Sequence, residues 1–175
     1  FPFSPRTRRV IHPAKFWPRS KIQTPGLGWV TRCVFRLRVA RMGGSGWAWD
    51  RPTAGSGAME CALANVTSPA DEVIVLVGGT FAARWTEIAA AYGLTVRVVD
   101  VDWRAGATVE QVQAALDKWP RADVVFHTWS ESSTGVLNHP GDIGSLLRSR
   151  DKFFIVDAVS GLAVSSMEMD AWKID

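Results

Sequence analysis

Short apolar runs alternate with helical segments after residue 52, and this alternation constrains the fold more than any other feature. Four runs have the length of a β-strand and are apolar on both faces, at 72–77, 95–101, 123–126 and 153–156. Helices are predicted from Ala58 to about Val66, over 81–92 with Gly93 in the C′ position, from the capping box at 108–111 to before Pro120, and over 141–148. Such an alternation is typical of a parallel sheet buried between helix layers. We therefore predict an α/β fold with three layers, in which a mainly parallel sheet lies between helices.

The first 52 residues differ in composition from the rest, so we divide the chain into residues 1–52 and residues 53–175. Residues 1–50 hold ten Lys or Arg and one acid, a net charge of +9, whereas residues 51–175 carry −6. Proline and glycine interrupt this first segment, and only Val30 to Met42 has apolar residues at helical spacing. We interpret 1–52 as a basic segment, rich in Trp, Arg, Pro and Gly, that is non-native or disordered.

Three interpretations of this basic segment stay open. Clustered arginines with Trp17 and Trp29 are what a nucleic-acid-binding arm would use to contact phosphates and stack on bases. A solvated basic tail has the same composition. Out-of-frame translation of GC-rich DNA also enriches Trp, Arg, Gly, Pro and Ser. No nucleic-acid-binding motif accompanies the arginines, so we expect no nucleic-acid partner.

Several classes of protein are not expected from this sequence. Two cysteines, Cys33 and Cys61, make neither a disulfide framework nor a four-ligand zinc cluster, and no other spacing indicates a metal site. The longest unbroken aliphatic run, Val73 to Val77, is far shorter than the ~20 residues of a membrane helix. The basic start does not lead into the apolar region of a secretory signal. We expect a cytoplasmic protein without a membrane partner.

Ligands of a parallel sheet bind beyond the carboxyl ends of its strands, so the residues directly after each apolar run are candidates for a site. Gly55 and Ser56 precede a helix and offer N–H groups and a hydroxyl to an anion, although an ordinary N-cap has the same residues. Phe81 begins a helix at a strand end, a position where most aromatic side chains belong to the core. Ser132 lies in a hydroxyl-rich loop, 131–135, that also has the composition of a simple turn.

The remaining candidates are titratable or nucleophilic. Asp157 ends an apolar strand, where a carboxylate needs a cationic or N–H partner; a local cap onto the turn at 159–160 is the alternative. His127 could act as a general base, but no second histidine or nucleophile accompanies it. We predict that His127 is packed with its hydrogen bonds satisfied and that Cys61 belongs to the core.

Five motifs in a fixed order carry a resemblance to a known family. They are A-G-S-G-A-M-E at 54–60, G-G-T-F-A-A-R-W at 78–85, S-E-S-S-T-G-V-L at 130–137, D-A-V-S at 157–160 and M-D-A-W-K-I-D at 169–175. Together they resemble the class V (fold type I) aminotransferases that depend on pyridoxal 5'-phosphate, most closely the alanine–glyoxylate and serine–pyruvate aminotransferase group. This resemblance identifies residues 53–175 as a partial large domain that binds pyridoxal phosphate.

The resemblance also implies a role for each candidate residue. Gly55 and Ser56 would bind the cofactor phosphate, Phe81 would stack on the pyridine ring, Ser132 would contact the cofactor near its ring oxygen, and Asp157 would pair with the protonated ring nitrogen. The implied reaction is the transfer of an amino group between a small amino acid, alanine or serine, and an oxo acid such as glyoxylate or pyruvate. The resemblance also implies that the full-length protein is a homodimer.

The sequence departs from the family pattern at several positions. Gly78 replaces the family's Asn and Ala82 its Gly, which alters the detail of the ring pocket. The family's Schiff-base lysine lies beyond the I-D pair and therefore after Asp175, and Lys173 is not that lysine. No catalytic residue is assigned, and we expect these 175 residues to be inactive alone. The alternatives are another class V enzyme, such as a lyase or a desulfurase, and an inactive remnant with a basic tail.

Overall fold

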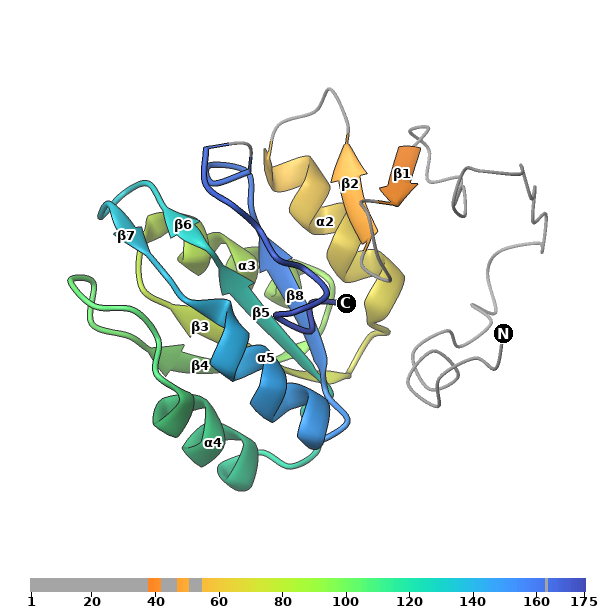
Figure 1. Ribbon diagram of the computed structural model, residues 1–175. Helices are drawn as coiled ribbons and strands as arrows, with labels where there is room; N and C mark the ends of the chain where they lie inside the picture. Colours follow the sequence, from red (N-terminus) through yellow and green to blue (C-terminus); the bar gives the residue numbers. More distant parts are fainter. Residues whose placement is uncertain (1–37, 42–46, 51–54, 163) are drawn as a thin grey trace.

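The structure, a computed structural model, describes residues 38–41, 47–50, 55–162 and 164–175 (Figure 1). Strand β1 (Arg38–Arg41) pairs antiparallel with β2 (Trp47–Asp50). In the segment from Val30 to Met42, which has apolar residues at helical spacing, Arg38–Arg41 form a strand, and the rest of the segment lies outside the described residues. Ala54, the first residue of the A-G-S-G motif, also lies outside them. The division at residue 52 stays a prediction.

Four parallel strands form the central sheet, in the order β4-β3-β5-β8. Their bounds are Glu72–Val77 for β3, Thr95–Asp100 for β4, Val124–Thr128 for β5 and Phe153–Asp157 for β8. The register sets Val75 opposite both Val98 and Phe126, and Phe126 in turn opposite Ile155. The predicted parallel sheet is confirmed.

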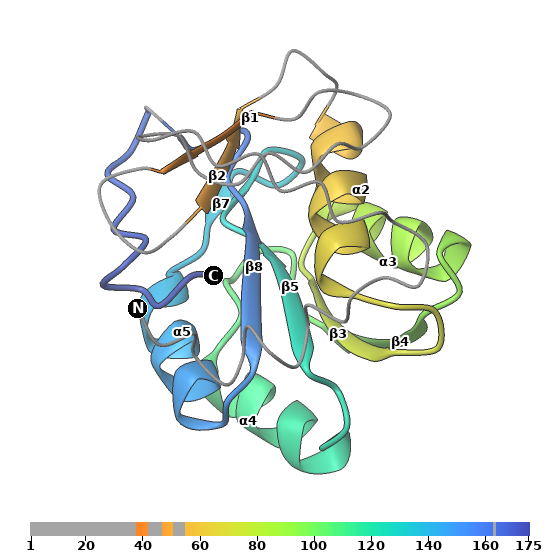
Figure 2. The same cartoon turned by 90° about the vertical axis from the view of Figure 1, so that its right-hand side faces the viewer.

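Helices cover both faces of this sheet (Figures 1 and 2). Helices α2 (Gly55–Val66) and α3 (Thr80–Ala91) pack on one face, and α4 (Val109–Lys118) and α5 (Pro140–Ser149) pack on the other. The predicted capping box is present at the start of α4, where Thr108 and Gln111 exchange hydrogen bonds between side chain and backbone. Gly93, with φ +74°, follows α3 in the left-handed conformation that favours glycine. The three-layer arrangement is thus confirmed.

The apolar run in β3 explains why the sheet is buried on both sides. Its residues 73–76 are at most 1 % exposed. Val73 and Val75 pack into the cluster formed with α2 and α3, whereas Ile74 and Leu76 pack into the cluster formed with α4 and α5. Successive side chains of a strand point to opposite faces, so a strand that is covered on both faces has to be apolar throughout.

The chain reverses its direction across the sheet between β3 and β5. From β3 it passes through α3 to β4 on one side, and then through α4 to β5 on the other side of β3 and on to β8. The loops that follow β3 and β5 therefore leave neighbouring strands toward opposite faces. In open α/β sheets, such a switch point at the carboxyl ends of the strands is where ligands bind.

A small hairpin replaces part of the polar loop expected after β5. Strand β6 (Ser130–Glu131) pairs antiparallel with β7 (Val136–Leu137), and Gly135 between them has φ +79°. Asn138 anchors the end of this hairpin to β5, because its side-chain nitrogen donates to the carbonyl of Thr128 at 2.8 Å. Serine and threonine made the segment look like a plain loop, although it contains short extended pieces.

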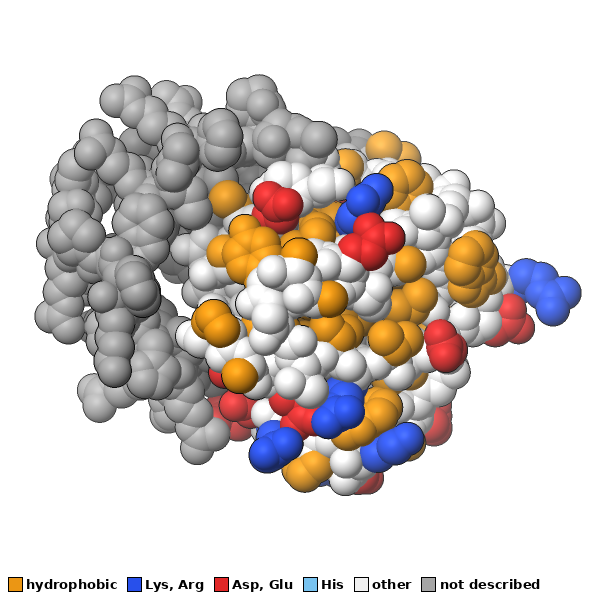
Figure 3. All heavy atoms as spheres, turned by 180° about the vertical axis from the view of Figure 1, so that it is seen from behind, with side chains coloured by type: hydrophobic (Ala, Val, Ile, Leu, Met, Phe, Trp, Pro, Cys, Tyr) orange, Lys and Arg blue, Asp and Glu red, His pale blue; other side chains and the backbone are white. Residues whose placement is uncertain are grey.

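The C-terminal segment returns to the free edge of β8. The N–H of Asp175 donates to the carbonyl of Phe154 at 3.0 Å, and the N–H of Phe154 donates to the Asp175 carboxylate at 3.1 Å. Seen from behind, the described surface carries Lys and Arg beside Asp and Glu, with apolar side chains interspersed (Figure 3). Among the described residues, no helix is long and apolar enough to span a membrane.

Candidate functional site

The N-terminal end of α3 is capped by a carboxylate from another part of the chain. The Glu131 side chain in β6 accepts hydrogen bonds from the N–H groups of Ala82, at 2.8 Å to Oε2, and Phe81, at 3.4 Å to Oε1. The N-cap residue of the helix, Gly79, has no side chain that could do this. Free N–H groups and the helix dipole favour an anion at this end. Glu131, only 1 % exposed, therefore finds there the donors that a buried carboxylate needs.

The loop that contains Ser133 completes the partners of this carboxylate. Ser133 donates to Glu131 Oε1 through its N–H at 3.1 Å and its hydroxyl at 2.6 Å, and its Oγ accepts from the Thr80 N–H at 3.0 Å. Gly79 passes so close that a Cβ on it would overlap the Glu131 side chain and lie 2.7 Å from Ser133 Oγ. The backbone of Gly79 is extended, so space rather than conformation demands glycine here. These contacts join the loops after β3 and β5.

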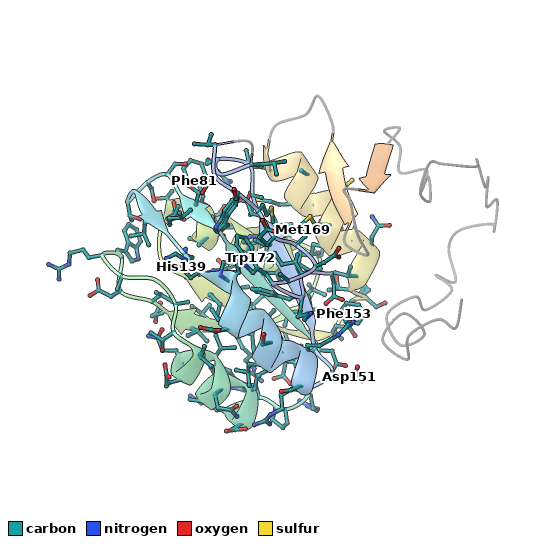
Figure 4. All side chains as sticks on the ribbon, viewed as in Figure 1. Phe81, His139, Asp151, Phe153, Met169 and Trp172 are labelled. Atoms are coloured by element: carbon teal, nitrogen blue, oxygen red, sulfur yellow. The ribbon has the colours of Figure 1, made fainter. Side chains whose placement is uncertain are left out.

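Phe81 stands directly above this junction, as the second residue of α3. Phe81 is 50 % exposed, in contrast to the neighbouring Ala82, which is 2 % exposed. The ring lies at the end of the sheet where β6 and the loop after β8 also lie (Figure 4). Phe81 therefore differs from an ordinary core residue: its side chain is exposed, while its backbone N–H donates to a buried carboxylate. The structure thus places Phe81 at the carboxyl edge of the sheet with its ring accessible.

Asp157, the last residue of β8, is partly buried at the same edge. One oxygen of its carboxylate accepts from the Val159 N–H at 2.9 Å. Burial raises the pKa of Asp157, the Val159 hydrogen bond opposes this rise, and the nearby charge of Glu131 adds to it. No Lys or Arg of the described residues forms an ion pair with Asp157. The local cap foreseen as an alternative is therefore present, but it supplies one neutral donor and no positive charge.

Thr128 lies beside Asp157 in the neighbouring strand. The two residues are partners in the parallel register of β5 and β8. Thr128 is buried, and its hydroxyl oxygen has no hydrogen-bond partner within the described part of the chain. Alternation along each strand sets both side chains on the face of Phe126 and Ile155, which is the face that α2 and α3 cover. At the carboxyl ends of β5 and β8, this face of the sheet therefore presents the Thr128 hydroxyl and the Asp157 carboxylate, both of which can accept further hydrogen bonds.

The remaining predicted site residues converge on the turn after β8. Gly55, the first residue of α2, lies against Val159: a Cβ on Gly55 would be 3.6 Å from that side chain. Ser56 follows in the first turn of α2 and is partly buried. Ser132 donates its hydroxyl to Ser160 at 2.6 Å, which links the loops after β5 and β8. The structure therefore places the starts of α2 and α3 and the ends of β5 and β8 around one edge.

Sequence reasoning missed two residues of this edge, Glu131 and Thr128. Glu131 belongs to a quoted motif but received no role, because a carboxylate in a serine-rich loop looks solvated. The signal that marks it is its position: it comes three residues after the end of the buried strand β5, so its side chain can enter the crowded end of the sheet. Thr128 carried no such signal.

The other titratable candidates lie away from this edge or differ from expectation. His127 is buried and packed, with its ring stacked on Phe154 at 6.0 Å between centroids. Its two ring nitrogens have no hydrogen-bond partner among the described residues, so the prediction of a satisfied histidine is wrong. Cys61 is only partly buried, not a core residue. In the described part of the chain, no three His, Cys, Asp or Glu side chains gather as metal ligands.

Comparison with known proteins agrees with this geometry. Residues 53–175 match the family model described as aminotransferase class-V. The chain belongs to the class V aminotransferases. This match spans all the elements that build the edge described above, from α2 to the end of the chain.

This class V aminotransferase chain spans about a third of the length of the relatives that it matches. It is 36 % identical over 126 residues to the soluble hydrogenase, small subunit, of Synechococcus sp., covering 69 % of this chain and 32 % of that protein. It is 32 % identical over 129 residues to the (S)-ureidoglycine–glyoxylate transaminase of Bacillus subtilis. That match covers 74 % of this chain and 31 % of the transaminase. The solved structure of an alanine–glyoxylate aminotransferase from Nostoc sp. matches with a TM-score of 0.66 at 31 % identity, over 69 % of this chain and 32 % of that one.

Proposed function

We propose that this class V aminotransferase chain binds pyridoxal 5'-phosphate beyond the carboxyl ends of β3, β5 and β8. The whole protein would transfer an amino group between a small amino acid, alanine or serine, and an oxo acid such as glyoxylate or pyruvate. One observation carries the proposal. The N-terminus of α2, the exposed side chain of Phe81 and the partly buried carboxylate of Asp157, which has no cationic partner among the described residues, meet at one edge of the sheet.

The charge at Asp157 supports this cofactor most directly. A partly buried carboxylate with a raised pKa and a second acid nearby is stabilised by a positive partner. The protonated ring nitrogen of pyridoxal phosphate is such a partner. The hydroxyl of Thr128 lies next to Asp157 in the register and has no partner among the residues that the structure describes, so it leaves a further polar atom for the same ring edge. The donors and acceptors at this end of the edge therefore fit a pyridinium group.

The opposite end of the cofactor requires donors for a phosphate. The first turn of α2 begins at Gly55 and Ser56, and a helix N-terminus offers N–H groups and a favourable dipole to such an anion. No acidic residue lies in that first turn, so nothing there repels a phosphate. Phe81 would cover one face of the ring, and Ser132, already directed at Ser160, would contact the ring oxygen.

These residues act by holding groups and one proton in place. When bound, the cofactor supplies an electron sink for the α-carbon of the amino acid. Asp157 keeps the proton on the ring nitrogen, because a carboxylate stabilises the charged form of a neighbouring base. The Val159 N–H orients that carboxylate. Phe81 excludes water from one ring face and fixes the plane of the ring.

Substrate class, assembly and compartment belong to the proposal as well. The names of the Bacillus and Nostoc relatives both contain glyoxylate, which supports an oxo acid of that size as amino acceptor. We propose a homodimer for the full-length protein and a cytoplasmic location.

Binding of the cofactor and the charge at Asp157 can be tested together. Titration of the purified protein with pyridoxal phosphate, followed by its absorbance, should show saturable binding, and alanine or serine with glyoxylate or pyruvate should give turnover in the full-length enzyme. Asp157→Asn should retain the fold but lower that turnover by roughly 10² to 10⁴, the effect of several kcal/mol of electrostatic stabilisation.

Asp100→Asn is the matched control, because Asp100 is also the last residue of a parallel strand but is exposed on the edge strand β4. It should behave like the unchanged protein. Absence of cofactor binding would disprove the proposal. Unchanged activity of Asp157→Asn with bound cofactor would reduce Asp157 to a cap of the turn at Val159.

A further inference from the structure

We propose that Glu131 is a positioning residue of the cofactor site, which fixes Phe81 by holding the N-terminus of α3. The inference rests on the proposed function for the identity of the ligand that Phe81 contacts. Glu131 itself lies beneath the surface and is 1 % exposed, so it acts through other residues.

The hydrogen bonds of Glu131 make a carboxylate necessary at this position. Four donors meet its two oxygens: the N–H groups of Phe81, Ala82 and Ser133 and the hydroxyl of Ser133. A carboxylate has only acceptors and can satisfy all four. An amide of the same shape has one accepting oxygen, and its NH₂ group would face at least one of these donors. Replacing the carboxylate by an amide therefore breaks a bond on one side or the other.

The position of Phe81 depends on these bonds because, within the described part of the chain, the N-cap residue of α3 makes no side-chain cap hydrogen bond. The φ and ψ of Gly79 are extended and it has no side chain, and Thr80 N–H donates to Ser133, which is itself bonded to Glu131. The first turn of α3 is thus fixed relative to β5 rather than by its own sequence. Because the ring of Phe81 projects from this first turn, its distance from the end of β5 is set by Glu131.

The placement of Glu131 also relates the ring to Asp157. Glu131 is close enough to raise the pKa of Asp157, while it touches the backbone of Phe81. One side chain thus neighbours the residue proposed for the ring face and the residue proposed for the ring nitrogen. The segments that carry Phe81 and Asp157 are therefore held in one arrangement before a ligand binds. This lowers the entropic cost of ordering them on binding.

Amide hydrogen exchange of the cofactor-free protein tests the anchoring alone. Glu131→Gln should raise the exchange rates of the Phe81 and Ala82 amides at least about tenfold, since a hydrogen bond to a charged group is lost. Glu131→Asp retains the charge on a shorter side chain and should show a smaller increase. Glu87→Gln is the control, because it makes the same chemical change on the same helix at an exposed position.

A double-mutant cycle on cofactor affinity tests whether Glu131 acts through Phe81. Glu131→Gln should weaken binding of pyridoxal phosphate about tenfold when Phe81 is present, and less than about twofold in a Phe81→Ala background. An equal loss in both backgrounds would show that Glu131 only supports the fold and would overturn the inference. Exchange rates at Phe81 and Ala82 that equal those of Glu87→Gln would overturn it too.

The outcomes separate this inference from the proposed function. Absence of pyridoxal phosphate binding in the unchanged protein refutes the function, whereas the exchange rates still decide whether Glu131 anchors Phe81. If Glu131→Gln does not fold, Ser133→Ala tests the same bonds. It removes one donor to Glu131 and the acceptor of Thr80, and it should raise the exchange rate of the Thr80 amide. An unchanged Thr80 rate in Ser133→Ala would count against the anchor.

Discussion

Replacement of His127 by phenylalanine should remove a specific part of the pH dependence of stability. The imidazole is completely buried, stacks on Phe154, and has no hydrogen-bond partner on either nitrogen among the described residues. Burial lowers the pKa of His127 from 6.5 to about 4. Between these values the unfolded chain binds a proton that the folded chain does not. The free energy of unfolding is therefore fully retained above pH 6.5 and falls as the pH decreases toward 4.

The two pKa values set the size of the effect. A shift of one unit corresponds to about 1.4 kcal/mol, so the loss relative to pH 8 is about 2 kcal/mol at pH 5 and about 3 kcal/mol near pH 4. Phenylalanine keeps a flat ring against Phe154 and cannot be protonated. It also removes two buried polar atoms whose desolvation costs roughly 1–3 kcal/mol when they are unpaired. The variant should therefore be at least as stable as the unchanged protein at pH 8 and clearly more stable at pH 5.

Urea unfolding, followed by tryptophan fluorescence, measures the free energy of unfolding at pH 8 and at pH 5. The decrease in unfolding free energy between the two pH values should be about 2 kcal/mol smaller in His127→Phe than in the unchanged protein. His139→Gln, at an exposed histidine, controls for the loss of a histidine as such. If His127→Phe is destabilised at pH 8 and keeps the full pH dependence, the imidazole is hydrogen-bonded in solution and the reasoning from burial fails.

Three further substitutions test particular contacts. Gly79→Ala places a methyl group on the Glu131 carboxylate and should cost at least about 2 kcal/mol, as overpacking does, with faster amide exchange at the start of α3. Thr108→Ala removes the capping box of α4 and should lower the unfolding free energy by about 1 kcal/mol in urea titrations, whereas Thr108→Ser should not. Gly144→Ala would overlap the carbonyl of Trp172, so the C-terminal segment should detach and the fluorescence of Trp172 should shift to the red; an unshifted spectrum would contradict this contact.

The alternation of apolar runs and helices was sufficient to predict the sheet, because periodicity and burial are local properties of the sequence. The strand over 72–77 and the capping box at Thr108 illustrate this, since each is defined within a few residues. The hairpin of β6 and β7 and the strand at Arg38–Arg41 were not predicted, because short pairs depend on a partner strand more than on their own residues. At the site, the positions of Phe81 and Asp157 follow from strand ends. The hydrogen bonds that Glu131 accepts from Phe81 and Ala82 do not, because these two residues lie 50 and 49 positions away in the sequence, on another element.

The cap of α3 by Glu131 bears on the order in which the chain folds. The bonded residues are 49 and 50 positions apart, so the first turn of α3 gains its cap only after β3 and β5 lie side by side. Closing a segment of this length costs chain entropy before the contact is formed. The later turns of α3 can form early, because their apolar face packs without this cap. The first turn, which carries Phe81, is capped only once the hairpin after β5 has formed. The edge proposed to bind the cofactor is then among the last parts of the domain to become ordered. A chain stalled before β5 would expose the start of α3 to proteolysis while its remaining turns are already protected.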